Sequence, residues 1–169
     1  MPRIILWSTF ISIISILIQA SVLANIPFMP VLPDLTLLIV LYVSFMNSSI
    51  AGSSAGFFSG LFLDFLSAAP IGLNAFTKTL TGFLAGRFSG SFNMNKLVLP
   101  VTLAVAGTVM KVVLSWVLSM LFGNSIVVYR LFSRDLWMEM AMNMFFAPLV
   151  FGLLGLFPSL FVDSHRSIE

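Results

Sequence analysis

Five ionisable side chains stand inside or at the edge of long apolar runs: Asp34, Asp64, Lys78, Lys111 and Glu139. They are the residues that could carry chemistry. Two carboxylates brought together could share a proton and work as an acid–base dyad. A carboxylate beside a lysine would form an ion pair instead, with a structural role.

Other kinds of catalytic chemistry lack their residues. The chain has no cysteine and one histidine, His165, in a polar tail, so no histidine metal site or catalytic triad can be built. Ser59 and Ser67 therefore have no histidine to act as a base. A dyad of Asp64 and Glu139 has no supporting residues around it. We expect no catalytic residue, no metal, no cofactor and no enzymatic activity.

The composition places these residues in a membrane protein. Of 169 residues, 59% are apolar and only 8% are charged, against about a quarter charged in soluble domains. The net charge is only +2 and no basic cluster occurs, which argues against nucleic-acid binding. The expected class is an all-α integral membrane protein.

Apolar run lengths and breaks predict the elements that must position the charges. About 20 residues cross a bilayer as a helix, so the length allows six spans and no separate aqueous domain. We predict one transmembrane domain over residues 1–169, with spans at 4–24, 35–47, 50–66, 72–89, 97–122 and 136–161.

Two parts of this assignment have alternatives. Residues 4–24 resemble a signal peptide, but the apolar run is longer than usual, which favours an ordinary first span. A helix over residues 35–65 would be about 46 Å long, too long for a ~30 Å bilayer core. A break at residues 46–49 gives two short spans; one tilted helix is the alternative.

The second predicted span begins at a proline and an acid. Pro33 is the last of three prolines that stop any preceding helix, and Asp34 stands directly before the apolar run. An aspartate there can accept hydrogen bonds from the free N–H groups of the first turn. We expect Asp34 to be the N-cap of this helix.

Glycines recur every four residues in the third and fourth spans. One row is Gly52, Gly56 and Gly60; the other is Gly82, Gly86 and Gly90. Residues four apart share a helix face, and a face of glycines lets another backbone approach closely. The two rows predict tight packing between neighbouring helices.

Each glycine row leads to a charge. Asp64 follows Gly60 by four residues, and Lys78 precedes Gly82 by four. The short turn containing Gly72 makes the two helices antiparallel, so both charges would lie near the same end. We predict an Asp64–Lys78 ion pair; the alternative is that both reach solvent at the interface.

Lys111 is the deepest charge of the predicted bundle, near its midplane. Glu139 and Asn143 are four apart on the last span and share a face. Lys111 is expected either to reach Glu139 as a structural pair or to line a polar cavity with Asn74 and Thr77.

The charges of the loops set the expected orientation. With six spans, Arg3, Arg87, Lys96 and Arg166 fall on one side. Arg130 and Arg134 fall on the other, together with Asp34 and Asp135. The positive-inside rule then places both termini in the cytoplasm.

Several of these residues also form a pattern typical of a known family. Pro33-Asp34 opens a span; Gly56-Phe57-x-x-Gly60-Leu61-x-x-Asp64 follows, and then Pro70-x-Gly72. The pattern resembles that of the bacterial rod shape-determining protein MreD family, over roughly residues 33–90. Asp34, Gly56, Gly60, Asp64 and Gly72 match it, with structural and assembly roles expected; Lys78 and Lys111 lie outside it.

The resemblance implies a function and partners. It implies an inner-membrane, non-enzymatic scaffold of the cell-elongation machine that binds MreC. Through MreC it would connect MreB filaments to RodA and a class B penicillin-binding transpeptidase, and so to cell shape. The fold implied is six helices, similar to the substrate-binding subunits of energy-coupling-factor transporters. Contact with membrane lipid follows, and a homo-oligomer stays open.

Two other functions are compatible with such a bundle. One is the small-molecule-binding subunit of an energy-coupling-factor transporter, with a pocket of polar residues such as Asp64, Asn74, Lys78 and Lys111. Those subunits dock a cytoplasmic partner through small residues of the first span, whereas Ala20 and Ala24 lie at its outer end. The other is a lipid-binding or lipid-flipping protein, using arginines of an outer loop.

Overall fold

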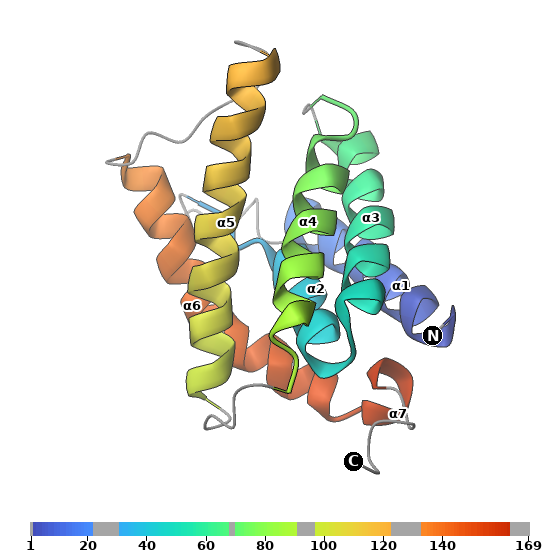
Figure 1. Ribbon diagram of the computed structural model, residues 1–169. Helices are drawn as coiled ribbons and strands as arrows, with labels where there is room; N and C mark the ends of the chain where they lie inside the picture. The colour runs from blue at the N-terminus through green and yellow to red at the C-terminus, as the bar shows by residue number, and fades with distance from the viewer. Residues whose placement is uncertain (1, 22–30, 68–69, 91–96, 123–132, 163–169) are drawn as a thin grey trace.

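A computed structural model describes residues 2–21, 31–67, 70–90, 97–122 and 133–162, and they form helices joined by turns (Figure 1). The helices are α1 (Pro2–Ser21), α2 (Leu35–Met46), α3 (Ser49–Leu66), α4 (Leu73–Arg87), α5 (Val98–Phe122), α6 (Arg134–Gly155) and α7 (Pro158–Phe161). The helices begin and end within about three residues of the predicted ranges. The exceptions are the last range, which divides into α6 and α7, and residues 22–24, which lie outside the described residues.

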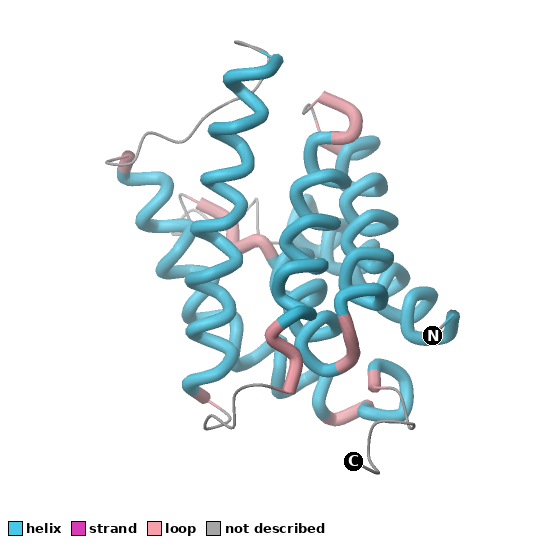
Figure 2. Tube along the Cα trace, in the orientation of Figure 1, coloured by secondary structure: helices cyan, strands magenta, loops and turns pink. Residues whose placement is uncertain are grey.

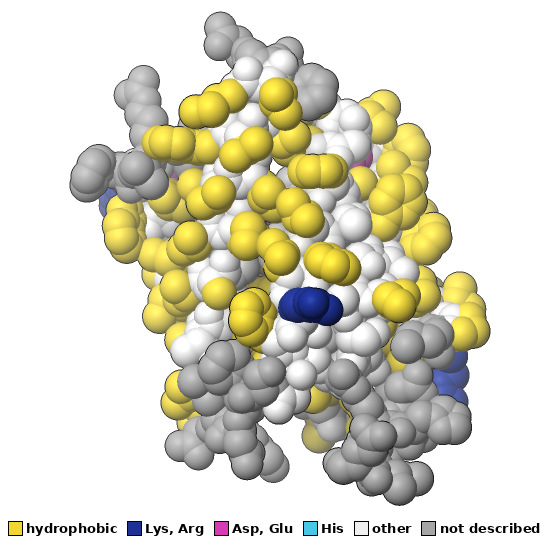
Figure 3. All heavy atoms as spheres, viewed as in Figure 1, with side chains coloured by type: hydrophobic (Ala, Val, Ile, Leu, Met, Phe, Trp, Pro, Cys, Tyr) yellow, Lys and Arg dark blue, Asp and Glu magenta, His cyan; other side chains and the backbone are white. Residues whose placement is uncertain are grey.

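Four of the described helices are long and apolar enough to cross a membrane: α1, α3, α5 and α6. Many of their large apolar side chains point outward, and Figure 3 shows such side chains over most of one face of the bundle. Exposing such an apolar surface to water costs free energy, whereas contact with lipid tails does not. The protein is therefore a multi-pass membrane protein.

A hairpin replaces what could have been one long helix. α2 ends at Met46, and α3 begins at Ser49 after a Ser48 cap that accepts a hydrogen bond from Ala51 N–H. Ser44 lies directly against Gly52. A continuous helix would hold residues eight apart at about 12 Å, so the single tilted helix is excluded.

The short helix α2 occupies the centre of the bundle. Ten of its 12 residues are buried, including Leu37, Leu38 and Val40. Twelve residues span about 18 Å, roughly half of a bilayer core. α2 therefore begins inside the bundle, and Figure 2 shows the loop before it entering at mid-height of α5. Asp34 is placed at that depth.

The glycine rows form the interface between α3 and α4, as their spacing predicts. A Cβ on Gly56 would lie 2.6 Å from the carbonyl carbon of Lys78, and one on Gly60 would lie 2.6 Å from Ala75 Cα. Gly52 and Gly82 face each other across the same interface. Helix backbones are in direct contact there, which side chains would prevent.

The remaining glycines of the rows differ. Gly86 packs against the backbone of Ser48 and Ser49, where the α2–α3 hairpin turns. Gly90 lies beyond the end of α4 with a positive φ of 76° and no atom near its Cβ position. Its predicted place in the packing row is wrong, because α4 ends before reaching it.

We expect Gly56→Ala to destabilise the protein, because the added methyl group would meet backbone that cannot move aside. Overpacking of this kind costs roughly 1–3 kcal/mol, more than the ~1 kcal/mol that alanine gains in a helix. The matched control is Gly152→Ala in α6, where a Cβ meets nothing within 4 Å. Thermal melting in detergent should separate the two; equal melting temperatures would contradict the packing.

The start of α1 and the last described helix, α7, meet on one side of the bundle. Asn47 Nδ2 donates to Val43 O at 2.8 Å and to Phe161 O at 2.7 Å, which holds α7 under the end of α2. Phe161 is fully buried beside Tyr42. Arg3, at the start of α1, donates to the carbonyl of Ser159 in α7. The start of α1 and the end of the described chain are thus neighbours.

Candidate functional site: a buried ion cluster

Asp34 is the centre of a cluster of charges inside the bundle. Lys78 Nζ, from α4, lies 2.8 Å from both carboxylate oxygens of Asp34. Lys111 Nζ, from α5, lies 3.2 Å from Asp34 Oδ2 and 2.5 Å from Glu139 Oε1 of α6. We call Asp34, Lys78, Lys111 and Glu139 the interior ion cluster. It joins four helices at one point.

The cluster is buried and balanced in charge. The side-chain exposures are 2% for Lys78, 3% for Glu139, 10% for Asp34 and 19% for Lys111. An unpaired charge at such depth is expensive, but two acids facing two lysines cancel. The four charges therefore compensate one another inside the bundle.

Asn143 extends the cluster with neutral groups. Its Oδ1 accepts from the backbone N–H of Asp34 at 2.7 Å, and its Nδ2 donates to Thr108 Oγ1 at 3.0 Å. Asn143 is fully buried and lies one turn after Glu139 on the same face of α6. Asn143 thus contacts the start of α2 directly, and Glu139 is linked to it through Lys111.

The chain before α2 needs these partners because it is not helical at this depth. Asp34 Oδ1 accepts from Leu37 N–H at 2.9 Å, which confirms the predicted N-cap. The carbonyl of Pro33 accepts from Gln19 Nε2 of α1. Free backbone groups inside a bilayer must find partners within the protein. Side chains of α1 and α6 supply them here.

The predicted Asp64–Lys78 ion pair is wrong. Lys78 points to the centre of the bundle and binds Asp34, while Asp64 binds the start of α4. The reason is the length of α2. A full-length second span would place Asp34 at the membrane surface, but the half-length helix α2 brings its carboxylate to the depth of Lys78.

Asp64 instead closes the turn between α3 and α4. Its two oxygens accept from the backbone N–H groups of Gly72 at 2.9 Å, Asn74 at 2.9 Å and Ala75 at 3.1 Å, and from Asn74 Nδ2 at 2.9 Å. Gly72 precedes α4 with a φ of +97° and has no side chain to act as cap. Asp64 caps α4 from the neighbouring helix.

The predicted polar cavity is also only partly right in its members. Lys111, Glu139 and Asn143 do lie together, and the Lys111–Glu139 contact is one of the two arrangements expected. Asn74 belongs to the Asp64 cap instead. Thr77 Oγ1 donates to Leu73 O of its own helix.

Thr108 and Gln19 also contribute hydrogen bonds to this site, although the sequence patterns did not predict them. Thr108 lies one turn before Lys111 on α5, a spacing that could have indicated a shared face. Gln19 is the only glutamine of the chain and lies in an apolar helix, where a polar side chain calls for a partner. Both signals were present but did not identify the partner.

The arrangement favours structure over catalysis. Each acid of the cluster is held by lysine, and Asp64 and Glu139 bind different partners, so they form no dyad. Within the described residues, no group of three or more His, Cys, Asp and Glu side chains could hold a metal ion. The ion pairs of the cluster hold the start of α2 and the helices α4, α5 and α6 together.

Comparisons with known proteins give the family. No curated protein and no solved structure matches the chain. A family model, that of the rod shape-determining protein MreD, matches residues 1–157 and confirms the resemblance seen in the sequence motifs. Because the match covers nearly the whole chain, this protein belongs to the MreD family, whose members are non-enzymatic membrane proteins that determine rod shape.

Proposed function

We propose that this protein is the inner-membrane scaffold of the cell-elongation complex. It binds MreC directly and, through MreC, links MreB filaments to RodA and a class B penicillin-binding transpeptidase. The observation that carries the proposal is the family match over residues 1–157. The contacts of Asp64 with the start of α4 and of Glu139 with Lys111 support a structural role for both acids.

The proposal includes six spans with both termini in the cytoplasm, in a fold similar to the substrate-binding subunits of energy-coupling-factor transporters. The contact between Arg3 and Ser159 supports an even number of crossings, because it joins the first and last described helices at one side. The excess of positive charge in the loops of that side supports the cytoplasmic orientation.

In this scaffold, interior residues hold the fold and outer faces receive the partner. The proposed structural residues are those of the glycine interface, the Asp64 cap and the start of α2: Pro33, Asp34, Gly52, Gly56, Gly60, Asp64, Gly72, Lys78, Gly82 and Gly86. The single span of MreC would pack on an apolar outer face, as transmembrane helices do. A second copy of this chain would use such a face too.

Affinity purification from the native membranes in mild detergent, followed by mass spectrometry, tests the proposal. We expect MreC, together with RodA and the transpeptidase, at levels well above a tagged, unrelated multi-pass protein used as control. Recovery of an ATPase pair and a coupling membrane subunit instead would overturn the proposal and make this chain a transporter's binding subunit.

A further inference from the structure

The two halves of helix α6, before and after Pro148, contact different helices. Before Pro148, Glu139 and Asn143 face α5 and hold Lys111 and Thr108. After Pro148, Phe151 packs against Tyr42 of α2, with ring centroids 5.2 Å apart. Proline lacks the N–H that would bond the preceding turn, so it is the usual site of a helix bend. Figure 1 shows α6 bending between α5 and α7.

Pro148 marks the boundary between two bodies of the bundle, which share one apolar core through Ala104 and Ala147. We call α5 with residues 134–147 of α6 the arm, and α1 to α4 with residues 149–155 the frame. The glycine interface packs α3 and α4 of the frame tightly together, since backbone there touches backbone. The arm has its own internal bonds, Lys111 to Glu139 and Asn143 to Thr108.

The charges of the interior ion cluster divide between the two bodies in the same way. Asp34 and Lys78 both belong to the frame and are joined by two contacts of 2.8 Å. Lys111 and Glu139 both belong to the arm and lie 2.5 Å apart. Each body therefore carries one complete, neutral ion pair.

The polar contacts between the arm and the frame are not needed to neutralise either ion pair. Lys111 reaches Asp34 at the longer distance of 3.2 Å, and Asn143 accepts from the Asp34 N–H. If the arm moved away, Asp34 would keep Lys78 and Lys111 would keep Glu139. Breaking a buried ion pair is normally prohibitive because it leaves an uncompensated charge. Here the separation leaves none.

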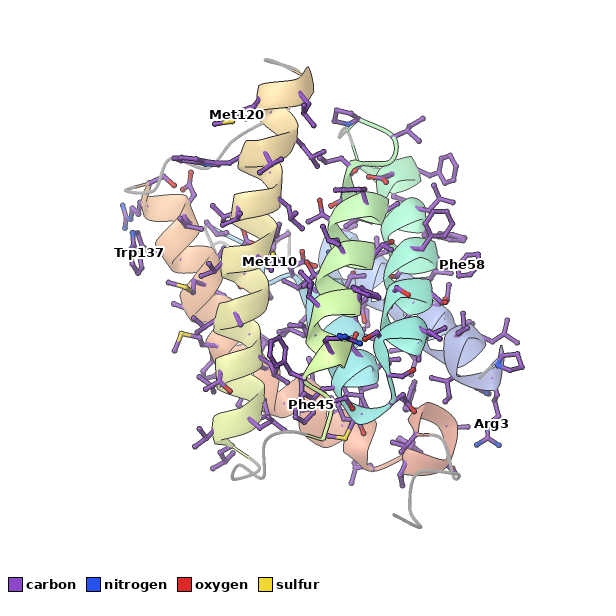
Figure 4. All side chains as sticks on the ribbon, viewed as in Figure 1. Arg3, Phe45, Phe58, Met110, Met120 and Trp137 are labelled. Atoms are coloured by element: carbon purple, nitrogen blue, oxygen red, sulfur yellow. The ribbon has the colours of Figure 1, made fainter. Side chains whose placement is uncertain are left out.

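We propose that the arm swings against the frame about Pro148, with the interior ion cluster as a joint that opens and closes without unpairing a charge. Gly107, one turn before Lys111 on α5, lies directly against the side chain of Leu41 of the frame, so the part of the arm below the cluster stays in contact. The motion is largest at the far end of α5, where Met120 lies (Figure 4).

Distances between pairs of spin labels, measured by double electron–electron resonance in lipid nanodiscs, test this motion. The chain has no cysteine, so introduced cysteines carry the only labels. Met120→Cys with Phe58→Cys measures arm to frame. Met120→Cys with Trp137→Cys measures within the arm, and Phe58→Cys with Phe76→Cys within the frame. All four side chains are exposed, and Figure 4 shows Met120, Trp137 and Phe58 on the outside of their helices.

We expect two populations for the arm-to-frame pair, separated by more than the ~1–2 Å of ordinary helix shifts, and one narrow population for each internal pair. Pro148→Ala should reduce the minor population, because it restores the helical hydrogen bond. Asn143→Leu should increase it by removing the bond to Asp34 N–H. A single narrow arm-to-frame distance that neither substitution changes would overturn the proposal. Equal broadening of the frame pair would overturn it too, since it would mean a loose bundle.

Discussion

Replacing Asp34 with alanine is expected to lower the apparent melting temperature in detergent by roughly 10 °C. The substitution leaves Lys78 buried without its carboxylate and removes the cap from α2. Removing one partner of a buried ion pair costs about 3–5 kcal/mol, and a kilocalorie corresponds to about 2–4 °C for a chain of this size. Asp135→Ala, at an exposed acid of α6, is the matched control and should melt like the wild type.

A second pair of variants separates charge from capping. Asp34→Asn keeps an oxygen for Leu37 N–H but leaves one positive charge in excess. Asp34→Asn combined with Lys78→Met removes the excess and should recover much of the lost stability. A double variant no more stable than Asp34→Asn alone would show that the unpaired charge of Lys78 does not cause the loss of stability.

The second large effect is expected at Asp64. Asp64→Leu leaves three backbone N–H groups of the α4 start without their acceptor. Hydrogen bonds to a charged group contribute about 1.5–3 kcal/mol each and are not additive, so we expect a loss of about 3 kcal/mol or more. Asp64→Asn keeps one acceptor oxygen and should lose about half as much.

Hydrogen exchange locates this effect. In Asp64→Leu, the amides of the first turn of α4 should exchange faster, while those of the buried helix α2 should be little changed. A substitution at Asp64 that leaves both melting and exchange at the wild-type level would show that the cap is not needed.

The parts of the fold that the sequence predicts correctly are those that depend on local residue patterns. Apolar run lengths and polar breaks placed the helices, because lipid allows few other backbone structures. Spacing by four predicted the α3–α4 packing, and Asp34 before an apolar run predicted its cap. Each of these depends on residues close together in the chain.

The partners of the charges could not be predicted in the same way. The pairing of Asp34 with Lys78 depends on how deep α2 begins, which apolar composition does not encode. The sequence identifies Asp64 as an acid within an apolar run. It does not show that Asp64 caps α4, because that contact depends on the left-handed conformation of Gly72. Which charges pair across a helix bundle depends on how deep each side chain lies in the bundle, and the whole fold sets that depth.

The proposed scaffold acts through its fold and its partners rather than through chemistry at its buried charges. The most direct test combines Lys111→Met with Glu139→Gln, which removes the neutral ion pair of the arm and leaves Asp34 with Lys78. The variant would replace the native copy in its own rod-shaped cells, with folding checked by melting. We predict a folded protein and rod-shaped cells. A folded variant at normal abundance in rounded cells would contradict this proposal, because the charges themselves would then be needed.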